Sequence, residues 1–445
     1  MSRAVLPPTS PPTLTLTLPP RRGVPPPPKK KKNSQQEATA FAPATVANLG
    51  PGFDWLGVAV GPAPGAPEAE AASSGDWVTA RAMPSLQPGE VVIEDIVGDG
   101  GRLGRDPATN CVGIAAKETM RLLGAAPSCG VALRLKKGLP LGSGLGSSAA
   151  SAAAAAWAVN ALFGRPLSKD QLVLAGLASE AAVSGYHADN VAPALMGGFV
   201  LVRSCDPLAL TRLPFGGAAE AMARAAAAAA GAGTAMAMEM EAGSGESSSS
   251  SSSDSSDDDD DDDDGPKKEE DKERRRREAD QAAAKKKKKK GKHSSSSAPP
   301  PLYFVLVNPV FEAPTAKMRA ALPQDVPFKS LVHNSTHGGA LVAAILAGDA
   351  AALGLCLDSG DRVIEPARAP LIPGLAAVKE AAKEAGAYGC TISGAGPTAV
   401  AIVDCPDVGA RVAEAMGRAF KAGGGLEVNS SRVAALDVEG ARLVM

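Results

Sequence analysis

The chain is poor in aromatic residues, histidine and paired cysteines, and these shortages limit its core and its metal chemistry. Aromatic residues make up 3% of the 445 residues, so the core must be built from alanine, valine and leucine. Four histidines are too few to favour a multi-histidine metal site. The six cysteines stand singly, without a Cys-x-x-Cys pair. This argues against a zinc site or a disulfide framework and indicates a reducing compartment.

The sequence also lacks long apolar runs and a strong net charge. No uninterrupted apolar stretch reaches about 20 residues, so no transmembrane helix and no membrane partner are expected. The formal net charge of -2 gives no indication of a nucleic-acid partner. With 44% hydrophobic residues, the chain is long enough for two domains with their own cores.

Two segments have a composition that cannot build a core. Residues 1–36 are rich in proline and threonine, carry arginine and lysine, and contain no acid before Glu37. They are predicted to be a disordered transit-like tail, with a basic tail lacking any targeting role as the alternative. Residues 217–300 carry runs of alanine, serine, aspartate, arginine and lysine. They are predicted to be a disordered insert, because like charges repel; a nucleic-acid patch is the less favoured reading.

The remaining sequence alternates strand-like and helix-like segments. Short β-type runs occur at 91–93, 131–135, 198–203, 302–307 and 400–403. Alanine-rich helical runs occur at 149–162, 172–184, 340–347 and 375–385. The pattern predicts a mixed α and β protein, with domains at 37–216 and 301–445 separated by the insert.

The most informative segment is a glycine- and serine-rich loop at 138–151, between a predicted strand and a predicted helix. Glycines allow close backbone approach, and a helix N-terminus offers unpaired N–H groups, so the junction suits phosphate binding. A P-loop is excluded because it requires Gly-Lys-Ser/Thr, and residues 138–151 contain no lysine. A Rossmann fingerprint fits poorly, because the expected acid about 20 residues later is Lys169. The alternative is a tight turn that only starts a helix.

Three motifs in order give the chain a specific resemblance. The loop resembles the ATP-binding motif of the GHMP kinases. Residues 42–57 resemble the N-terminal substrate motif of that family, and residues 389–398 resemble its third motif. Segments 187–193, 313–323 and 365–373 are similar to the homoserine kinases within the family. Segment 331–337 departs from their pattern, so His333 and His337 are given no site role and are expected to be surface or packing residues.

This resemblance implies a fold, a cofactor and a metal. The fold is a two-domain α+β GHMP kinase architecture, with an N-terminal domain like the second domain of ribosomal protein S5 and a ferredoxin-like C-terminal domain. ATP and Mg²⁺ are the implied cofactor and metal, and Ser147 and Glu180 are the implied metal ligands. The implied ATP-binding residues are Pro140, Leu141, Gly142, Ser143, Gly144, Leu145, Gly146, Ser147, Ser148, Ala149, Ala150 and, on the purine side, Asn110.

The resemblance also implies how a zwitterionic substrate would be held. Guanidinium groups bind carboxylates bidentately, while acids and amides accept from an ammonium. The implied substrate residues are Asn48, Asp54, His187, Arg319, Arg368, Gly394 and Gly396, and the implied catalytic residues are Asp189, Asn190 and Glu180. Asp189 is assigned to positioning, with a base role left open. Without the resemblance, Glu180 would read as a solvated helix carboxylate and the two glycines as a plain turn.

The expected reaction is phosphorylation of the L-homoserine hydroxyl by ATP. The alternatives are a kinase for another small alcohol such as mevalonate, or an inactive nucleotide-binding regulator. Mevalonate has no ammonium group, so Asp54 and Asn48 would have no purpose there. A plastid location is expected, with the cytosol as the alternative, and a homodimer is left open.

Overall fold

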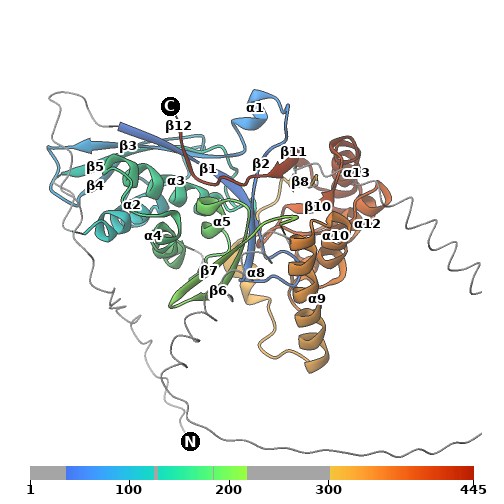
Figure 1. The fold of residues 1–445 in the computed structure, drawn as a ribbon. Coiled ribbons are helices and arrows are strands. Elements are labelled where there is room, and N and C mark those ends of the chain that lie inside the picture. The colour runs from blue at the N-terminus through green and yellow to red at the C-terminus, as the bar shows by residue number, and fades with distance from the viewer. Residues whose placement is uncertain (1–36, 125–128, 184, 218–300, 445) are drawn as a thin grey trace, which may run out of the picture.

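The computed structural model describes residues 37–124, 129–183, 185–217 and 301–444 (Figure 1). The transit-like tail and residues 218–300 of the insert lie outside the described residues. The N-terminal elements are β1 (Glu37–Ala47), β2 (Leu56–Pro62), α1 (Glu68–Ala71), β3 (Gly75–Met83), β4 (Val91–Val97), α2 (Cys111–Leu122), β5 (Gly130–Lys136), α3 (Ser147–Leu162), α4 (Lys169–Val183), α5 (Val191–Met196), β6 (Phe199–Cys205) and β7 (Leu208–Leu213). The C-terminal elements are β8 (Tyr303–Pro309), α8 (Thr315–Ala320), α9 (Phe328–Ala347), α10 (Ala350–Ser359), α11 (Ile364–Arg368), the 3-10 helix η1 (Ala369–Leu371), α12 (Leu375–Glu384), β9 (Gly389–Ile392), β10 (Ala399–Val403), α13 (Pro406–Gly424), β11 (Val428–Leu436) and β12 (Arg442–Val444).

One mixed sheet of the described strands runs through both halves of the molecule. Its order is β4-β5-β3-β1-β2-β11-β8-β10-β9, with β12 beside β1 and the β6–β7 hairpin beside β2. Strands β4 and β5 are parallel and are joined by a crossover through α2. Because β11 pairs with both β2 and β8, the end of the chain joins the two halves. The exact domain limits at 216 and 301 stay a prediction.

The C-terminal half is ferredoxin-like, as predicted. Its strands follow in the order β8, β9, β10, β11 along the chain, with helices between β8 and β9 and between β10 and β11. In the sheet they lie in the order β11-β8-β10-β9, and all three pairs are antiparallel. This is the β-α-β-β-α-β arrangement. The helices α9, α10, α12 and α13 lie on this side of the molecule (Figure 1).

The core is built from small aliphatic residues, as the low aromatic content predicts. Helix α3 buries twelve of its residues, most of them alanine, between β1 and β3 on one side and α2, α4 and α5 on the other. A helix that is apolar all round must be buried, and alanine lets its neighbours approach closely. Buried residues form two clusters, a large one around α3 and a smaller one between α12, α13 and the C-terminal strands.

Two further expectations can be compared with the described residues. None of the helices there is both long and apolar enough to span a bilayer. All six cysteines are free thiols. Burial raises the pKa of the Cys390 thiol to about 12 and that of Cys111 to about 11, so both thiols stay protonated at neutral pH.

Candidate active site

A cavity of about 580 Å³ lies where the two halves meet. It is lined by the glycine-rich loop, the end of α4, the segment before α5, the start of α8, the end of α11 and the β9–β10 turn. The structure therefore brings together residues as far apart in sequence as Asn48 and Gly396. The predicted site residues that line it are Asn48, Asn110, Leu141, Gly142, Ser143, Gly144, Gly146, Ser147, Ser148, Glu180, His187, Asn190, Arg319, Arg368, Gly394 and Gly396.

The glycine-rich loop has the backbone that an anion site requires. Gly142, Gly144 and Gly146 all have positive φ, a conformation that favours glycine. Gly146 precedes the first residue of α3, and no side chain caps this helix. Its first N–H groups therefore have no side-chain acceptor and carry the positive end of the helix dipole toward the cavity. The arrangement suits phosphate oxygens.

The C-terminal motif holds the loop from the other side. The Ser393 hydroxyl donates to the Gly144 carbonyl at 2.7 Å, and the Thr398 hydroxyl donates to the Ser143 carbonyl at 2.6 Å. A side chain at position 144 would lie 2.5 Å from the Ser393 carbonyl oxygen, so only glycine fits this contact. These contacts join the β9–β10 turn to the glycine-rich loop at the wall of the cavity.

Sequence reasoning missed a buried ion pair at the start of the loop. The Lys137 ammonium group contacts the Asp76 carboxylate and donates to the hydroxyls of Ser147 at 2.6 Å and Ser151 at 3.0 Å. Asp76, on β3, is completely buried and also accepts from the backbone N–H groups that follow Lys137. A lysine directly before the glycine-rich loop is a sequence signal that could have indicated this anchor.

The two loop serines have different partners. The Ser148 hydroxyl donates to Glu180 Oε1 at 2.9 Å, so the first turn of α3 meets the end of α4. The Ser147 hydroxyl contacts Lys137 and donates to the Leu139 carbonyl at 3.3 Å. Glu180 is 3% exposed and lines the cavity, which excludes an ordinary solvated helix carboxylate.

The first motif folds into a strained turn between β1 and β2. Asn48 and Asp54 have φ values of 57° and 60°, a conformation in which asparagine and aspartate are the most tolerated after glycine. The Asn48 side chain accepts from the Asp54 N–H at 2.8 Å and fixes the turn. Asp54 then accepts both ends of the Arg319 guanidinium at 3.0 Å each. Such strain often accompanies functional sites.

Arg368 also lines the cavity and is almost completely buried. Its guanidinium donates to the carbonyls of Met318 at 3.2 Å and Gly394 at 3.1 Å. Burial, followed by the neighbouring charge of Arg319, lowers its pKa from the ordinary value. The Phe53 ring lies 5.0 Å from this guanidinium and 5.4 Å from that of Arg319. The ring therefore stabilises two like charges.

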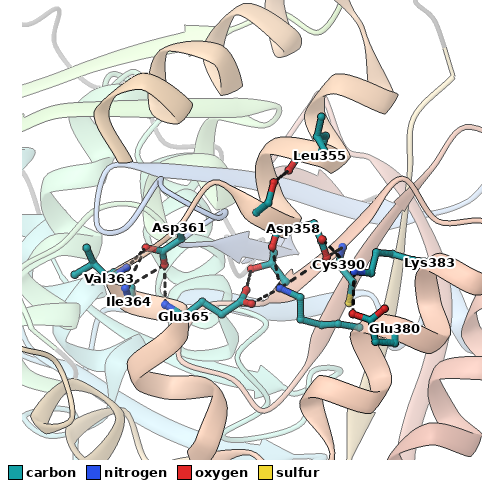
Figure 2. A network of polar contacts seen from close by, with 12 residues as sticks. Leu355, Asp358, Asp361, Val363, Ile364, Glu365, Glu380, Lys383 and Cys390 are labelled. Carbon is teal, nitrogen blue, oxygen red and sulfur yellow. Dashed lines mark hydrogen bonds and ion pairs between the residues drawn. The ribbon is translucent and has the colours of Figure 1, made fainter. Parts of the chain in front are cut away.

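A polar network holds the start of the short helix α11, whose last residue is Arg368 (Figure 2). Asp361 accepts from the backbone N–H groups of residues 363, 364 and 365 at the start of α11. Glu365 contacts Lys379 and accepts from the Thr391 hydroxyl at 2.5 Å. Burial raises the pKa of Glu365, although the Lys379 charge opposes this. The network joins α10, α11, α12 and β9.

The segment before α5 gathers three predicted residues. Asp189 is buried and does not line the cavity, but its Oδ1 lies 3.2 Å from His187 Nδ1 and 3.5 Å from Asn190 Nδ2. Burial alone would lower the pKa of His187, but the hydrogen bond and charge of Asp189 outweigh it and raise the pKa to about 9. His187 is therefore an imidazolium at neutral pH. Asp189 acts on the cavity through its two neighbours.

Several of the predicted site residues make contacts that support the fold, or do not line the cavity. Asn110 caps α2 by accepting from the Val112 N–H at 3.1 Å and donates to the Gly104 carbonyl at 2.7 Å, so both ends of its amide are engaged. The predicted residues that do not line the cavity are Asp54, Pro140, Leu145, Ala149, Ala150 and Asp189. His333 and His337 stack on each other within α9, outside the cavity, which agrees with a packing role.

Comparisons with known proteins agree with the motifs. Residues 110–198 match the GHMP kinase N-terminal domain, and residues 341–422 match the GHMP kinase C-terminal domain. Homoserine kinase of Arabidopsis thaliana is 48% identical over 91% of this chain and 84% of its own length. Homoserine kinase of Pyrococcus abyssi is 30% identical over 81% of this chain and 86% of its own.

Solved structures give the same result at the level of the fold. The homoserine kinase of Cytophaga hutchinsonii superimposes with a TM-score of 0.66 and 30% identity, over 93% of this chain and 99% of its own. A mevalonate kinase of L. major superimposes with a TM-score of 0.51 at 15% identity, over 93% of this chain and 99% of its own. The second likeness concerns the fold alone and does not identify an acceptor.

Proposed function

The chain belongs to the GHMP kinases and, within them, to the homoserine kinases, and from this membership we propose that it phosphorylates L-homoserine with ATP. The γ-phosphoryl group passes to the substrate hydroxyl, giving O-phospho-L-homoserine and ADP. The observation that carries the proposal is one cavity lined by a phosphate-type loop, a buried glutamate and the arginines Arg319 and Arg368. Phosphoryl transfer needs such positioning and charge stabilisation more than covalent help.

The charges of Arg319 and Arg368 on the cavity wall, and of Asp54 paired with Arg319, fit an amino-acid acceptor. Asp54 and Arg319 neutralise each other, while the guanidinium of Arg368 donates to backbone carbonyls and lies beside an aromatic ring. A zwitterion offers an ammonium to Asp54 and a carboxylate to the arginines, so every charge stays paired when the Asp54–Arg319 pair opens. A mevalonate-like anion would leave Asp54 without a partner, which is costly in a half-buried site. This favours homoserine over mevalonate.

The residues present also fit Mg²⁺. Magnesium prefers oxygen ligands and is usually held by one or two carboxylates together with substrate phosphates. Glu180 and Ser148 supply a carboxylate and a hydroxyl 2.9 Å apart on the cavity wall. Groups of three or more histidine, cysteine or acidic side chains that could hold a metal are absent from the described residues, which suits a metal shared with ATP. We assign Glu180 and Ser148 to this role, since Ser147 is engaged by Lys137. Bound Mg²⁺ would neutralise charge on the phosphates.

The remaining residues orient the acceptor. Arg319 and Arg368 hold its carboxylate, and Asp54 holds its ammonium, with Asn48 fixing the turn that presents Asp54. Asn190 holds the hydroxyl, and the His187 imidazolium adds positive charge near the transferred group. Asp189 lies 3.2 Å from His187 Nδ1 and serves for positioning, because it does not line the cavity.

The test is ADP release with Mg-ATP on homoserine, mevalonate, galactose and shikimate. Glu180→Gln should lower turnover of homoserine at least about 100-fold, because it removes a charge at the reacting end of the site. Arg319→Ala should lower it at least about 10-fold, because it removes a charge that binds the substrate. The matched controls are Glu118→Gln and Arg121→Ala, which remove a surface ion pair on α2 and should leave turnover unchanged. Turnover confined to another alcohol would overturn the substrate. Absence of turnover on all four would favour the inactive regulator.

Residues 1–36 support a plastid address, because they combine arginine and hydroxyl residues with no acid. A plant relative at 48% identity is in line with this. A fusion of residues 1–36 to a fluorescent protein should be imported by isolated chloroplasts and shortened. A fusion that stays outside and uncut would favour the cytosol.

A homodimer stays a prediction that light scattering on the purified chain can decide.

A further inference from the structure

We propose that Thr45 is a positioning residue for phosphoryl transfer, whose hydroxyl turns the amide of Asn190 so that its nitrogen faces the acceptor. The inference rests on the proposed function, which puts the substrate hydroxyl beside Asn190. Thr45 itself does not line the cavity. It acts only through Asn190.

The contacts of Thr45 join three parts of the site. It lies in β1 and is completely buried. Its hydroxyl donates to Asn190 Oδ1 at 2.8 Å, just before α5, and its backbone N–H donates to the carbonyl of Leu145 in the glycine-rich loop at 3.1 Å. A single residue thus fixes the acceptor side of the site relative to the phosphate side.

The neighbouring carboxylate decides which way the amide points. Asp189 Oδ1 accepts a hydrogen bond from Asn190 Nδ2 at 3.5 Å. With the amide reversed, Asn190 Oδ1 would face this carboxylate, and two acceptors would meet. The Thr45 hydroxyl completes the arrangement, because it can donate to the amide oxygen. The amide group that remains to serve the cavity is therefore the N–H donor.

The glycine-rich loop leaves room for this hydrogen bond. A side-chain carbon at position 146 would lie 1.9 Å from Thr45 Oγ1 and 2.9 Å from Asn190 Oδ1. Gly146 also has a φ of 64°, so two independent requirements select glycine here. The loop passes directly over the Thr45–Asn190 contact, which places that contact next to the first turn of α3.

A donor amide has a defined effect on the acceptor. The N–H of Asn190 binds one lone pair of the hydroxyl oxygen and directs another toward the γ-phosphorus. The oxygen–phosphorus bond then forms while the bond from that phosphorus to the bridging oxygen of ADP breaks, and the hydroxyl proton passes to a phosphoryl oxygen. The amide takes no proton. Loss of its orientation should therefore slow the transfer step more than it weakens ATP binding.

The test compares Thr45→Val, which keeps the shape and removes the hydroxyl, with Thr45→Ser, which keeps the hydroxyl. Thr45→Val should lower kcat about 10- to 100-fold with the KM for ATP within about two-fold, whereas Thr45→Ser should stay within about three-fold of wild type. The matched control is Thr39→Val. Thr39 lies in the same strand and has a 2.9 Å hydroxyl contact to Thr79, away from the cavity. This control should leave kcat unchanged.

A double-mutant cycle separates positioning from general packing. In an Asn190→Ala background, Thr45→Val should cause no further loss of kcat, because its target is gone. Thermal melting checks the fold, and Thr45→Ala replaces Thr45→Val if that variant melts early. The proposal is overturned if Thr45→Val keeps wild-type kcat, if Thr45→Ser is equally impaired, or if the two losses simply add. If wild type prefers another alcohol, the proposed substrate fails, but the same comparison on that alcohol still decides the role of Thr45.

Discussion

Asp76→Asn is the most revealing perturbation, because it removes the counter-charge of a completely buried lysine without changing side-chain size. Asp76 and the side chain of Lys137 are 0% and 1% exposed. Asparagine can still accept from the backbone N–H groups of Gly138 and Leu139, which bind Asp76 Oδ1 at 2.9 and 3.1 Å. What is lost is the charge, together with the Oδ2 acceptor that the Lys137 ammonium and the Ser151 hydroxyl contact. Breaking one side of a buried ion pair costs about 3–5 kcal/mol, so the free energy of unfolding should fall by that amount.

The double variant Asp76→Asn/Lys137→Met should recover most of this loss, to within about 2 kcal/mol of wild type, because no buried charge remains. The assay is urea unfolding followed by circular dichroism, with the midpoint and the slope compared. Glu414→Gln is the control. It breaks the exposed pair with Arg418 and should cost less than about 1 kcal/mol. The reasoning would be refuted if the free energy of unfolding of Asp76→Asn lay within about 1 kcal/mol of that of wild type. It would also be refuted if the loss in the double variant equalled the sum of the losses in Asp76→Asn and Lys137→Met measured alone.

Three other outcomes follow from the same structure. The pKa of His187 rises from 6.5 to about 9 on folding, so protonated His187 stabilises the folded state by on the order of 3 kcal/mol. This contribution is complete below pH 6.5 and is lost as the pH rises through 9. Asp189→Asn should therefore make the melting temperature depend less on pH over this range. Arg368→Lys should raise the KM for homoserine at least about 10-fold and leave the KM for ATP unchanged, because an ammonium cannot form the same fork; equal changes in both constants would contradict this. Asp54→Asn should reduce kcat/KM for homoserine more than for its analogue lacking the amino group, 4-hydroxybutyrate, and an equal loss on both would exclude an ammonium site.

Much of the fold was predictable because its signals are local. The strand-to-helix junction at 138–151 is read from glycines that permit positive φ and from a helix-forming alanine run beyond them. The alternation of short apolar runs and alanine-rich runs likewise predicted β4, β5, β10, α3, α4 and α12 to within a few residues. Helix α9 was underestimated, because its first half, Phe328 to His337, is largely exposed and has no strong apolar periodicity.

The site was predictable as a set of residues but not as a set of contacts. The resemblance supplied Arg319, Arg368 and Glu180, and the cavity brings all three together. It gave no indication that Asp54 pairs with Arg319, or that Lys137 pairs with Asp76. Neither pair has a characteristic spacing in the sequence, because each joins distant segments that only the folded structure places side by side.

The sequence by itself therefore determined the turns, the helix starts and the chemical types available for phosphate and zwitterion binding, since these depend on backbone freedom and side-chain chemistry over a few residues. Only the tertiary structure decided which groups meet. Strand β11 joins the two halves, the β9–β10 turn closes on the glycine-rich loop, and Thr45 reaches Asn190, 145 positions away. Such contacts depend on the packing of distant segments around α3, and burial then fixes the charge and orientation of the groups they join.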